Sequence, residues 1–286
     1  MSLLPWKAWP VSVDLEVLRA AAFLDPDGLE RGLVVADFHR RVDRSAFEAA
    51  CVLAGVEDLR ERMIGLDVLG QLGTPGRPFL EETLPVVIGA CGDWRPGVVQ
   101  SAVVALGHLA DPRGLDAVLR QAAHHDEDVR QAVAFALPSV GGDVASLEAV
   151  AALVRLSADR SDYVRDWATF GLGLEWAGES EQIRRALLDR VGDPDPDTAG
   201  EAFLGLARRG DRRMLAALCA ALEEDEPAYI LIEAAAELAA PEVLPALRRL
   251  KQQETPDDDA GTWKLDEAIS ACIGATHRRA ELDPMR

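Results

Sequence analysis

An internal repeat is the feature that most constrains how this chain can fold. A leucine-centred apolar segment recurs every 31 to 37 residues, with its central leucines at Leu69, Leu106, Leu137, Leu172, Leu206 and Leu238. The surrounding segments align without gaps, as VVQSAVVALGHL (98–109), VRQAVAFALPSV (129–140) and TAGEAFLGLARR (198–209) illustrate. A period in the low thirties is typical of stacked helical hairpins, each of which buries its apolar face against its neighbours.

A second amphipathic segment precedes each repeated one. Its apolar residues fall at positions i, i+3, i+4 and i+7, as in GLDAVLRQAAHH (114–125) and MLAALCAALEE (214–224), so they share one face of a helix. An acidic turn links the first helix of a pair to the second, for example DPDPD (193–197) and EEDEP (223–227). A turn with Gly or Pro follows the second helix, and this alternation of stop and start signals predicts a chain of helical hairpins.

Two second helices open with an especially clear motif, Asp128-Val129-Arg130 and Asp162-Tyr163-Val164-Arg165. With the small residues behind it and the A-L or G-L anchor, this pattern over residues 58–253 resembles HEAT repeats, and more narrowly the short HEAT-like repeats of the bacterial phycobilisome lyases. The resemblance implies an all-α, right-handed α-solenoid of about six or seven stacked helical hairpins. Tetratricopeptide arrays have a similar period, but their Trp/Gly/Tyr and late Pro pattern does not recur here.

The resemblance also implies contacts between neighbouring repeats. In such arrays a turn aspartate tends to bond the arginine of a neighbouring second helix, and the second helices line the concave face. Arginine is absent where the aligned helices carry Gln100 or Val99, Ala199 and Leu231. We therefore expect only a short ladder of Asp/Arg pairs.

Three segments are expected along the chain: residues 1–55 as an N-terminal helical cap, residues 56–253 as the HEAT-like array, and residues 254–286 as an acidic linker, a capping helix and a tail. A solenoid must cover the apolar faces of its first and last units, which is the physical reason for a cap at each end. The last helix is expected at about 263–275, after the acidic run ETPDDDAGT (254–262).

The net charge of the chain indicates which class of partner can bind it. The chain holds 49 Asp and Glu against 30 Lys and Arg, a net charge of -19. Binding that depends on phosphate neutralisation would need a local basic patch acting against this repulsive field. Nucleic acid is therefore an unfavourable partner, and a protein or peptide of basic character is a favourable one.

Targeting signals and cofactor motifs are also missing from the sequence. No stretch approaches the ~18 uninterrupted apolar residues of a membrane span, and Met1–Leu15 has no apolar run of signal-peptide length. The four cysteines are scattered singly in apolar helical segments, without a Cys-x-x-Cys pair. We expect a cytoplasmic monomer that engages no membrane and uses no metal or cofactor.

The acidic turns are predicted to share one edge of the array, because every connection from a first to a second helix points the same way in a stack. The candidate binding residues of this acidic edge are Asp195, Asp197, Glu223 and Glu224. Alternatively, the turn aspartates only cap helix N-termini, where a carboxylate accepts otherwise unpaired N–H bonds. The runs hold more carboxylates than a cap uses, and a basic protein surface could use the surplus.

The second helices supply a candidate groove. Trp167 takes a register at which other repeats carry Ala132, Glu201 and Glu233. The candidate residues of the concave face are Asp166, Trp167, Phe170, Trp176, Glu201 and Glu233. Interleaved aromatic and acidic side chains suit a basic or amphipathic partner helix. The competing interpretation is that Trp167 packs between repeats, since it lies near the core stripe of its helix.

These features predict a non-enzymatic interaction scaffold that binds a protein or peptide on its concave face and acidic edge. Stacked repeats offer a wide surface, and the sequence contains no catalytic signature. The resemblance leaves two alternatives open. One is a cofactor-attachment factor or lyase of the phycobilisome-lyase type. The other is a HEAT-like DNA-repair glycosylase that would use Trp167 with Asp166, although the net charge disfavours it.

Overall fold

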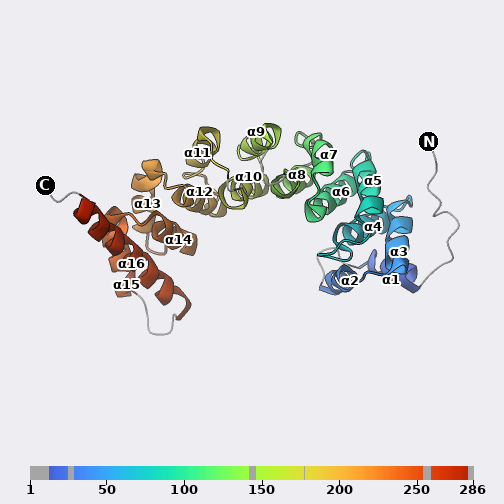
Figure 1. Ribbon diagram of the computed structural model, residues 1–286, viewed down its shortest axis with the longest axis horizontal. Helices are drawn as coiled ribbons and strands as arrows, with labels where there is room; N and C mark the ends of the chain where they lie inside the picture. Colours follow the sequence, from blue (N-terminus) through green and yellow to red (C-terminus); the bar gives the residue numbers. More distant parts are fainter. Residues whose placement is uncertain (1–12, 25–28, 142–145, 177, 254–258, 283–286) are drawn as a thin grey trace. The chain divides into compact units, whose positions relative to one another are not determined.

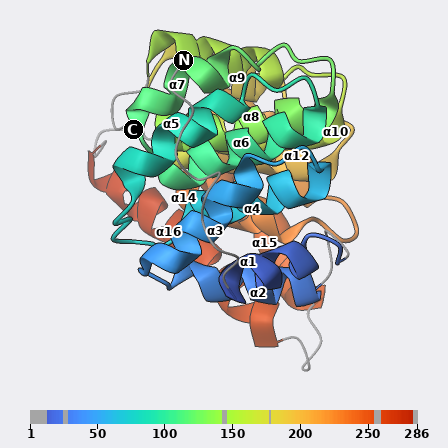
Figure 2. The same ribbon diagram turned by 90° about the vertical axis from the view of Figure 1, so that its right-hand side faces the viewer.

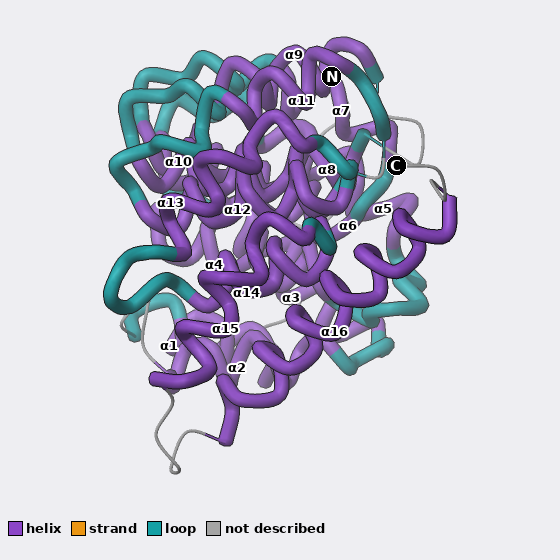
Figure 3. The backbone as a smooth tube through the Cα atoms, turned by 90° about the vertical axis from the view of Figure 1, so that its left-hand side faces the viewer, coloured by secondary structure: helices purple, strands orange, loops and turns teal. Residues whose placement is uncertain are grey.

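Helices make up all the regular secondary structure in the part of the chain that the structure describes (Figure 3). The computed structural model describes residues 13–24, 29–141, 146–176, 178–253 and 259–282. The chain divides into two compact units, Met1–Ala152 and Leu153–Arg286. The boundary lies within α9 (Leu147–Leu156) and not at the expected segment ends, so the capping segments at residues 1–55 and 254–286 stay predictions.

The first unit is a stack of antiparallel helical pairs (Figures 1 and 2). Its helices before α9 are α1 (Val13–Ala21), α2 (Leu29–His39), α3 (Arg44–Ala54), α4 (Leu59–Gln71), α5 (Leu80–Ala90), α6 (Pro96–Leu109), α7 (Leu115–Leu119) and α8 (Glu127–Val140). The second helices α4, α6 and α8 lie side by side, and α3, α5 and α7 pack against them. Helices α1 and α2 pack against α3 and α4 at the N-terminal end of this stack.

The second unit repeats the same arrangement. Its helices after α9 are α10 (Asp162–Phe170), α11 (Glu181–Leu188), α12 (Pro196–Arg208), α13 (Leu215–Leu222), α14 (Tyr229–Leu238), α15 (Leu244–Gln253) and α16 (Asp259–Leu282). Helices α10, α12, α14 and α16 stack on one another, while α11, α13 and α15 pack against α12, α14 and α16. The hairpin order predicted from the stop and start signals is therefore the order observed.

The repeated leucines form the cores of both stacks. Leu106, Leu137, Leu172 and Leu206 are 0 % exposed, and Leu69 is 1 % exposed. Truncating a leucine in such a core to alanine typically costs about 2–5 kcal/mol of stability. The sixth repeated leucine, at position 238, is only half-buried, because it lies at the end of α14.

The Asp/Arg ladder is present and short, as expected. Arg165 on α10 donates to both carboxylate oxygens of Asp193 in the following turn, at 2.9 and 2.8 Å. Burial alone would raise the pKa of Asp193, but the hydrogen bond and charge of Arg165 hold that pKa below its usual value. This aspartate therefore serves to join neighbouring repeats.

Two local features differ from the sequence-based expectation. The repeat alignment predicts a continuous helix over VRDWATFGLGLE (164–175), but α10 stops at Phe170 and is followed by a π-helical turn over Gly171–Glu175. The last helix runs from Asp259 to Leu282, longer than the expected 263–275 at both ends. At its C-terminal end the helix can continue past residue 275 because the sequence contains no Gly or Pro between residues 275 and 283 that would stop it.

Candidate functional site

Three carboxylates lie on consecutive second helices of the second unit. Asp166 is on α10, Glu201 on α12 and Glu233 on α14, and these helices pack against one another in that order. All three side chains are half-buried. The charges of both neighbours, Asp166 and Glu233, contribute to raising the pKa of Glu201. We call Asp166, Glu201 and Glu233 the carboxylate row.

Burial and mutual repulsion disfavour the charged forms in this row. Burial first, and then the charge of Asp166, raise the pKa of Glu201 to about 7. Burial first, and then the charges of Asp195 and Asp197, raise the pKa of Asp166 to about 6. The acidic edge and the carboxylate row are therefore electrostatically coupled, and part of the row is protonated near neutral pH.

The partners of the three carboxylates differ. Glu233 forms an ion pair with Lys264 Nζ at 3.3 Å. Among the described residues, neither Asp166 nor Glu201 has a cation within 4.0 Å. The Glu201 Oε2 atom is buried and has no hydrogen-bond partner there either. The charge of Arg208 lowers the pKa of Glu201 without offsetting its burial, and neither Asp166 nor Glu201 forms an ion pair within the described residues.

Aromatic side chains adjoin these two carboxylates. The rings of Trp167 and Phe170 meet edge to face, with centroids 5.9 Å apart and planes at 72°. Both side chains are half-buried, so part of the surface of each stays exposed. Trp176, which the sequence placed in the same groove, is only 5 % exposed. It packs in the core of the second unit, and we leave it out of the candidate surface.

The π-helical turn that follows Phe170 is held in place by glycines and one arginine. A Cβ atom on Gly205 of α12 would lie 2.6 Å from the Cα of Gly173, so this close approach requires glycine at position 205. The Arg209 guanidinium donates to the carbonyls of Leu172 and Gly173 at 2.8 and 2.7 Å. Single π-helical turns often occur at functional sites. Here the turn ends α10 directly after the aromatic pair.

The residues of the acidic edge fall into two kinds. Asp195 caps α12, accepting the Thr198 N–H at 2.8 Å, and Glu223 pairs with Arg249 at 3.2 Å. Asp197 and Glu224 are exposed, and they pair with no cation within the described residues. The capping interpretation therefore holds for Asp195, while Asp197 and Glu224 are left to interact with solvent or a partner.

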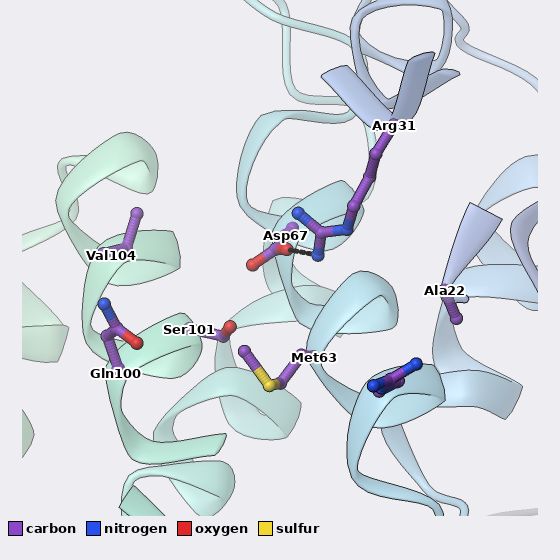
Figure 4. Close-up of a pocket in the computed structure, with 8 residues that line it drawn as sticks. Ala22, Arg31, Met63, Asp67, Gln100, Ser101 and Val104 are labelled. Atoms are coloured by element: carbon purple, nitrogen blue, oxygen red, sulfur yellow. Dashed lines mark hydrogen bonds and ion pairs between the residues drawn. The ribbon is translucent and has the colours of Figure 1, made fainter. Parts of the chain in front are cut away.

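The first unit contains a polar pocket that the sequence did not reveal (Figure 4). It has a volume of about 240 Å³ and lies between α2, α4 and α6. Arg31 reaches from α2 to Asp67 on α4, with Nη2 2.6 Å from the carboxylate, and Ser101 and Gln100 lie on the α6 side. Burial raises the pKa of Asp67 more than Arg31 and Ser101 lower it. The one available signal for this pair was that Asp67 stands between the apolar residues Leu66 and Val68.

In the part of the chain that the structure describes, no group of three or more His, Cys, Asp or Glu is placed to hold a metal ion. Burial raises the pKa of the Cys51 and Cys91 thiols to about 12 and that of Cys272 to about 11, which suits small core residues. The membrane expectation was checked in the same residues, and none of their helices is long and apolar enough for a bilayer crossing.

Comparison with known proteins gives the family. A family model described as HEAT repeats matches residues 53–138, 84–173 and 150–239. The protein YibA of Escherichia coli strain K12 is 35 % identical over 120 residues, which cover 42 % of this chain and 41 % of that protein. The chain thus spans about two fifths of the length of this curated relative.

Solved structures share the fold. The X-ray structure of Escherichia coli YibA matches with a TM-score of 0.69 at 21 % identity, over 93 % of this chain and 99 % of that chain. A structure of Kap95p with RanGDP matches with a TM-score of 0.61 at 14 % identity, over 96 % of this chain and 43 % of that one. Such likeness confirms the all-α, right-handed solenoid of stacked helical hairpins that the sequence predicted. Since the matched repeats span more than half of its sequence, this chain belongs to the HEAT-repeat family.

Proposed function

We propose that the protein is a non-enzymatic interaction scaffold that holds a basic protein or peptide against the carboxylate row and the acidic edge of its second unit. The HEAT-repeat fold is consistent with a scaffold. Kap95p, a protein of similar fold, binds RanGDP. The basic character of the partner is inferred from the charges of this chain alone.

The half-buried carboxylates of Asp166 and Glu201 carry the proposal. Half-buried carboxylates pay a desolvation cost that only a nearby cation or hydrogen-bond donor offsets. Among the described residues, no donor bonds Glu201 Oε2, and the charge of Arg208, which lowers the pKa of Glu201, does not offset its burial. A lysine or arginine from a partner would lower the pKa of both groups and stabilise their ionised forms, so binding would relieve a cost already present in the free protein.

The aromatic pair adds an apolar contact beside these carboxylates. Trp167 and Phe170 are half-buried on the same helix as Asp166. Tryptophan is enriched among the residues that contribute most to interfaces, and an aromatic face also attracts a cation. A partner helix that alternates basic and apolar residues would meet both kinds of surface.

The glycosylase alternative would assign Asp166 and Trp167 to a damaged base. The charges of Asp195 and Asp197 help to raise the pKa of Asp166, and the same charges would repel a phosphate backbone. The lyase alternative rests on no particular residue of this site. Neither alternative is therefore proposed.

The proposal is tested with a partner captured from native cytoplasm, identified by mass spectrometry and then purified. Its affinity is measured for the wild type and for the double variant Asp166→Asn/Glu201→Gln. We expect the variant to bind at least about tenfold more weakly, a loss of ~1.4 kcal/mol. Asp116→Asn and Glu148→Gln, which alter exposed carboxylates of the first unit, serve as matched controls and should change affinity less than twofold. Equal binding by the double variant and the wild type would contradict the proposal.

A further inference from the structure

A second pocket opens at the acidic edge, between the turn that precedes α12 and the turn that precedes α14. It has a volume of about 390 Å³. Its apolar wall comes from Ala199 and Phe203 of α12 and from Leu231 of α14. Glu224 and Glu226 stand beside this wall in the turn between α13 and α14. We call this the edge pocket.

The charges that line the edge pocket are not balanced. Asp193 also lines it, but its carboxylate is held by Arg165 at 2.8 Å and by Arg190 at 3.0 Å. Glu224 and Glu226 are exposed, and no cation of the described residues lies within 4.0 Å of either carboxylate. The edge pocket therefore combines an apolar wall with a net negative rim.

We propose that the edge pocket takes an arginine side chain of the basic partner. The inference rests on the proposed function, and it adds which side chain enters and where. Arginine buries its methylene stem along apolar surface and keeps its charged head near solvent. Pro196 and Ala199 offer that surface below the carboxylate rim, since Phe203 and Leu231 are only 3 % and 8 % exposed. Its planar fork of donors can meet two carboxylates at once, whereas lysine offers a compact point charge. Glu224 and Glu226 supply those two carboxylates.

The probe is N-acetyl-arginine amide, titrated into the full-length chain and followed by NMR of the Ala199 and Leu231 methyl groups. We expect saturable shifts of these methyls and binding about threefold or more tighter than that of N-acetyl-lysine amide. The same titration with N-acetyl-norleucine amide and with sodium chloride separates arginine binding from apolar contact and from ionic strength. Shifts that merely follow ionic strength would overturn the inference.

Three variants locate the binding. Glu224→Gln/Glu226→Gln removes the rim charges and should abolish saturable binding. Ala199→Leu fills the edge pocket while keeping every carboxylate, and it should abolish binding as well. Asp225→Asn removes an exposed carboxylate from the same turn that does not line the edge pocket, and it should bind as the wild type does. Equal losses in Asp225→Asn and in the rim variant would assign binding to a diffuse acidic surface and overturn the inference.

Failure of this inference and failure of the proposed function have different signatures. If arginine amide does not bind while the captured partner still depends on Asp166 and Glu201, only the edge pocket is wrong. If arginine amide binds in the edge pocket while the affinity of the partner does not depend on Asp166 and Glu201, the proposed function is wrong. Circular dichroism of each variant confirms that it is folded before its binding is interpreted.

Discussion

Two carboxylates of second helices, Asp67 in the first unit and Glu201 in the second, share an unfavourable environment and differ in how it is offset. Burial is the largest cause of a raised pKa in both. Asp67 has Arg31 at 2.6 Å, whereas no cation of the described residues pairs with Glu201 and its Oε2 atom has no hydrogen-bond partner there. Asp67 has an ion-pair partner within its own unit, which offsets part of the cost of burial, whereas Glu201 has no ion-pair partner among the described residues.

The difference separates a structural carboxylate from a candidate binding carboxylate. An internal ion pair ties α2 to α4 and leaves little for an external cation to gain. A carboxylate without such a pair lowers the stability of the free protein, and a cationic partner can recover that cost on binding.

The largest effect is expected when the internal cation of the first unit is removed. Arg31→Met leaves Asp67 buried without its partner and should destabilise the protein by about 2–4 kcal/mol, because breaking a buried pair leaves an uncompensated charge. The midpoint of urea unfolding measures this loss. The double variant Arg31→Met/Asp67→Leu should recover most of the lost stability. If Arg31→Met alone is as stable as the wild type, the contrast between Asp67 and Glu201 is wrong.

The aromatic pair should affect binding more than folding. Trp167→Ala is expected to weaken binding of the captured partner by about 2 kcal/mol, as truncating a central interface residue does. Val103, on α6 of the first unit, is 0 % exposed, so Val103→Ala should lower stability and leave affinity unchanged. Calorimetric titration and thermal melts measure the two effects. A destabilised Trp167→Ala that binds at full strength would place this ring in the core.

Neutralising the unpaired carboxylate should stabilise the free protein at high pH. A folded-state pKa raised to about 7 means that Glu201 costs stability above that pH and costs nothing below its unfolded pKa near 4.5. Glu201→Gln should therefore gain about 1–2 kcal/mol at pH 8, after solvent screening of this half-buried group is allowed for, and nothing at pH 4. Chemical unfolding at the two pH values tests this. An equal gain in stability at pH 8 and at pH 4 would contradict the raised pKa of Glu201.

Partner affinity should fall on acidification. A cation binds the ionised forms, so protons must leave Glu201 and Asp166 when the pH lies below their pKa values of about 7 and about 6. We expect the dissociation constant to rise about tenfold or more between pH 8 and pH 5.5, and the Asp166→Asn/Glu201→Gln variant to lose this dependence. An equally steep dependence in the variant would assign the effect to other groups.

The fold was largely predictable from the sequence, because burial of the repeated leucines depends only on helical periodicity and repeat spacing. The break in α10 was not predictable from the sequence. It depends on the contact between Gly173 and Gly205 and on the hydrogen bonds that Arg209 donates to carbonyls more than thirty residues earlier. In the site, the register predicted that Glu201 and Glu233 follow Trp167. It could not predict that Lys264 pairs with one of these glutamates only, because that contact depends on how α16 packs.

The most direct test of the central claim is the pKa of Glu201 in the free and bound protein. Carbon-detected NMR of the labelled side-chain carboxyl group follows its titration without and with saturating partner. We predict a pKa near 7 in the free protein and a value at or below the ordinary 4.5 in the complex. An ordinary pKa in the free protein, or a raised one that the partner leaves unchanged, would contradict the account.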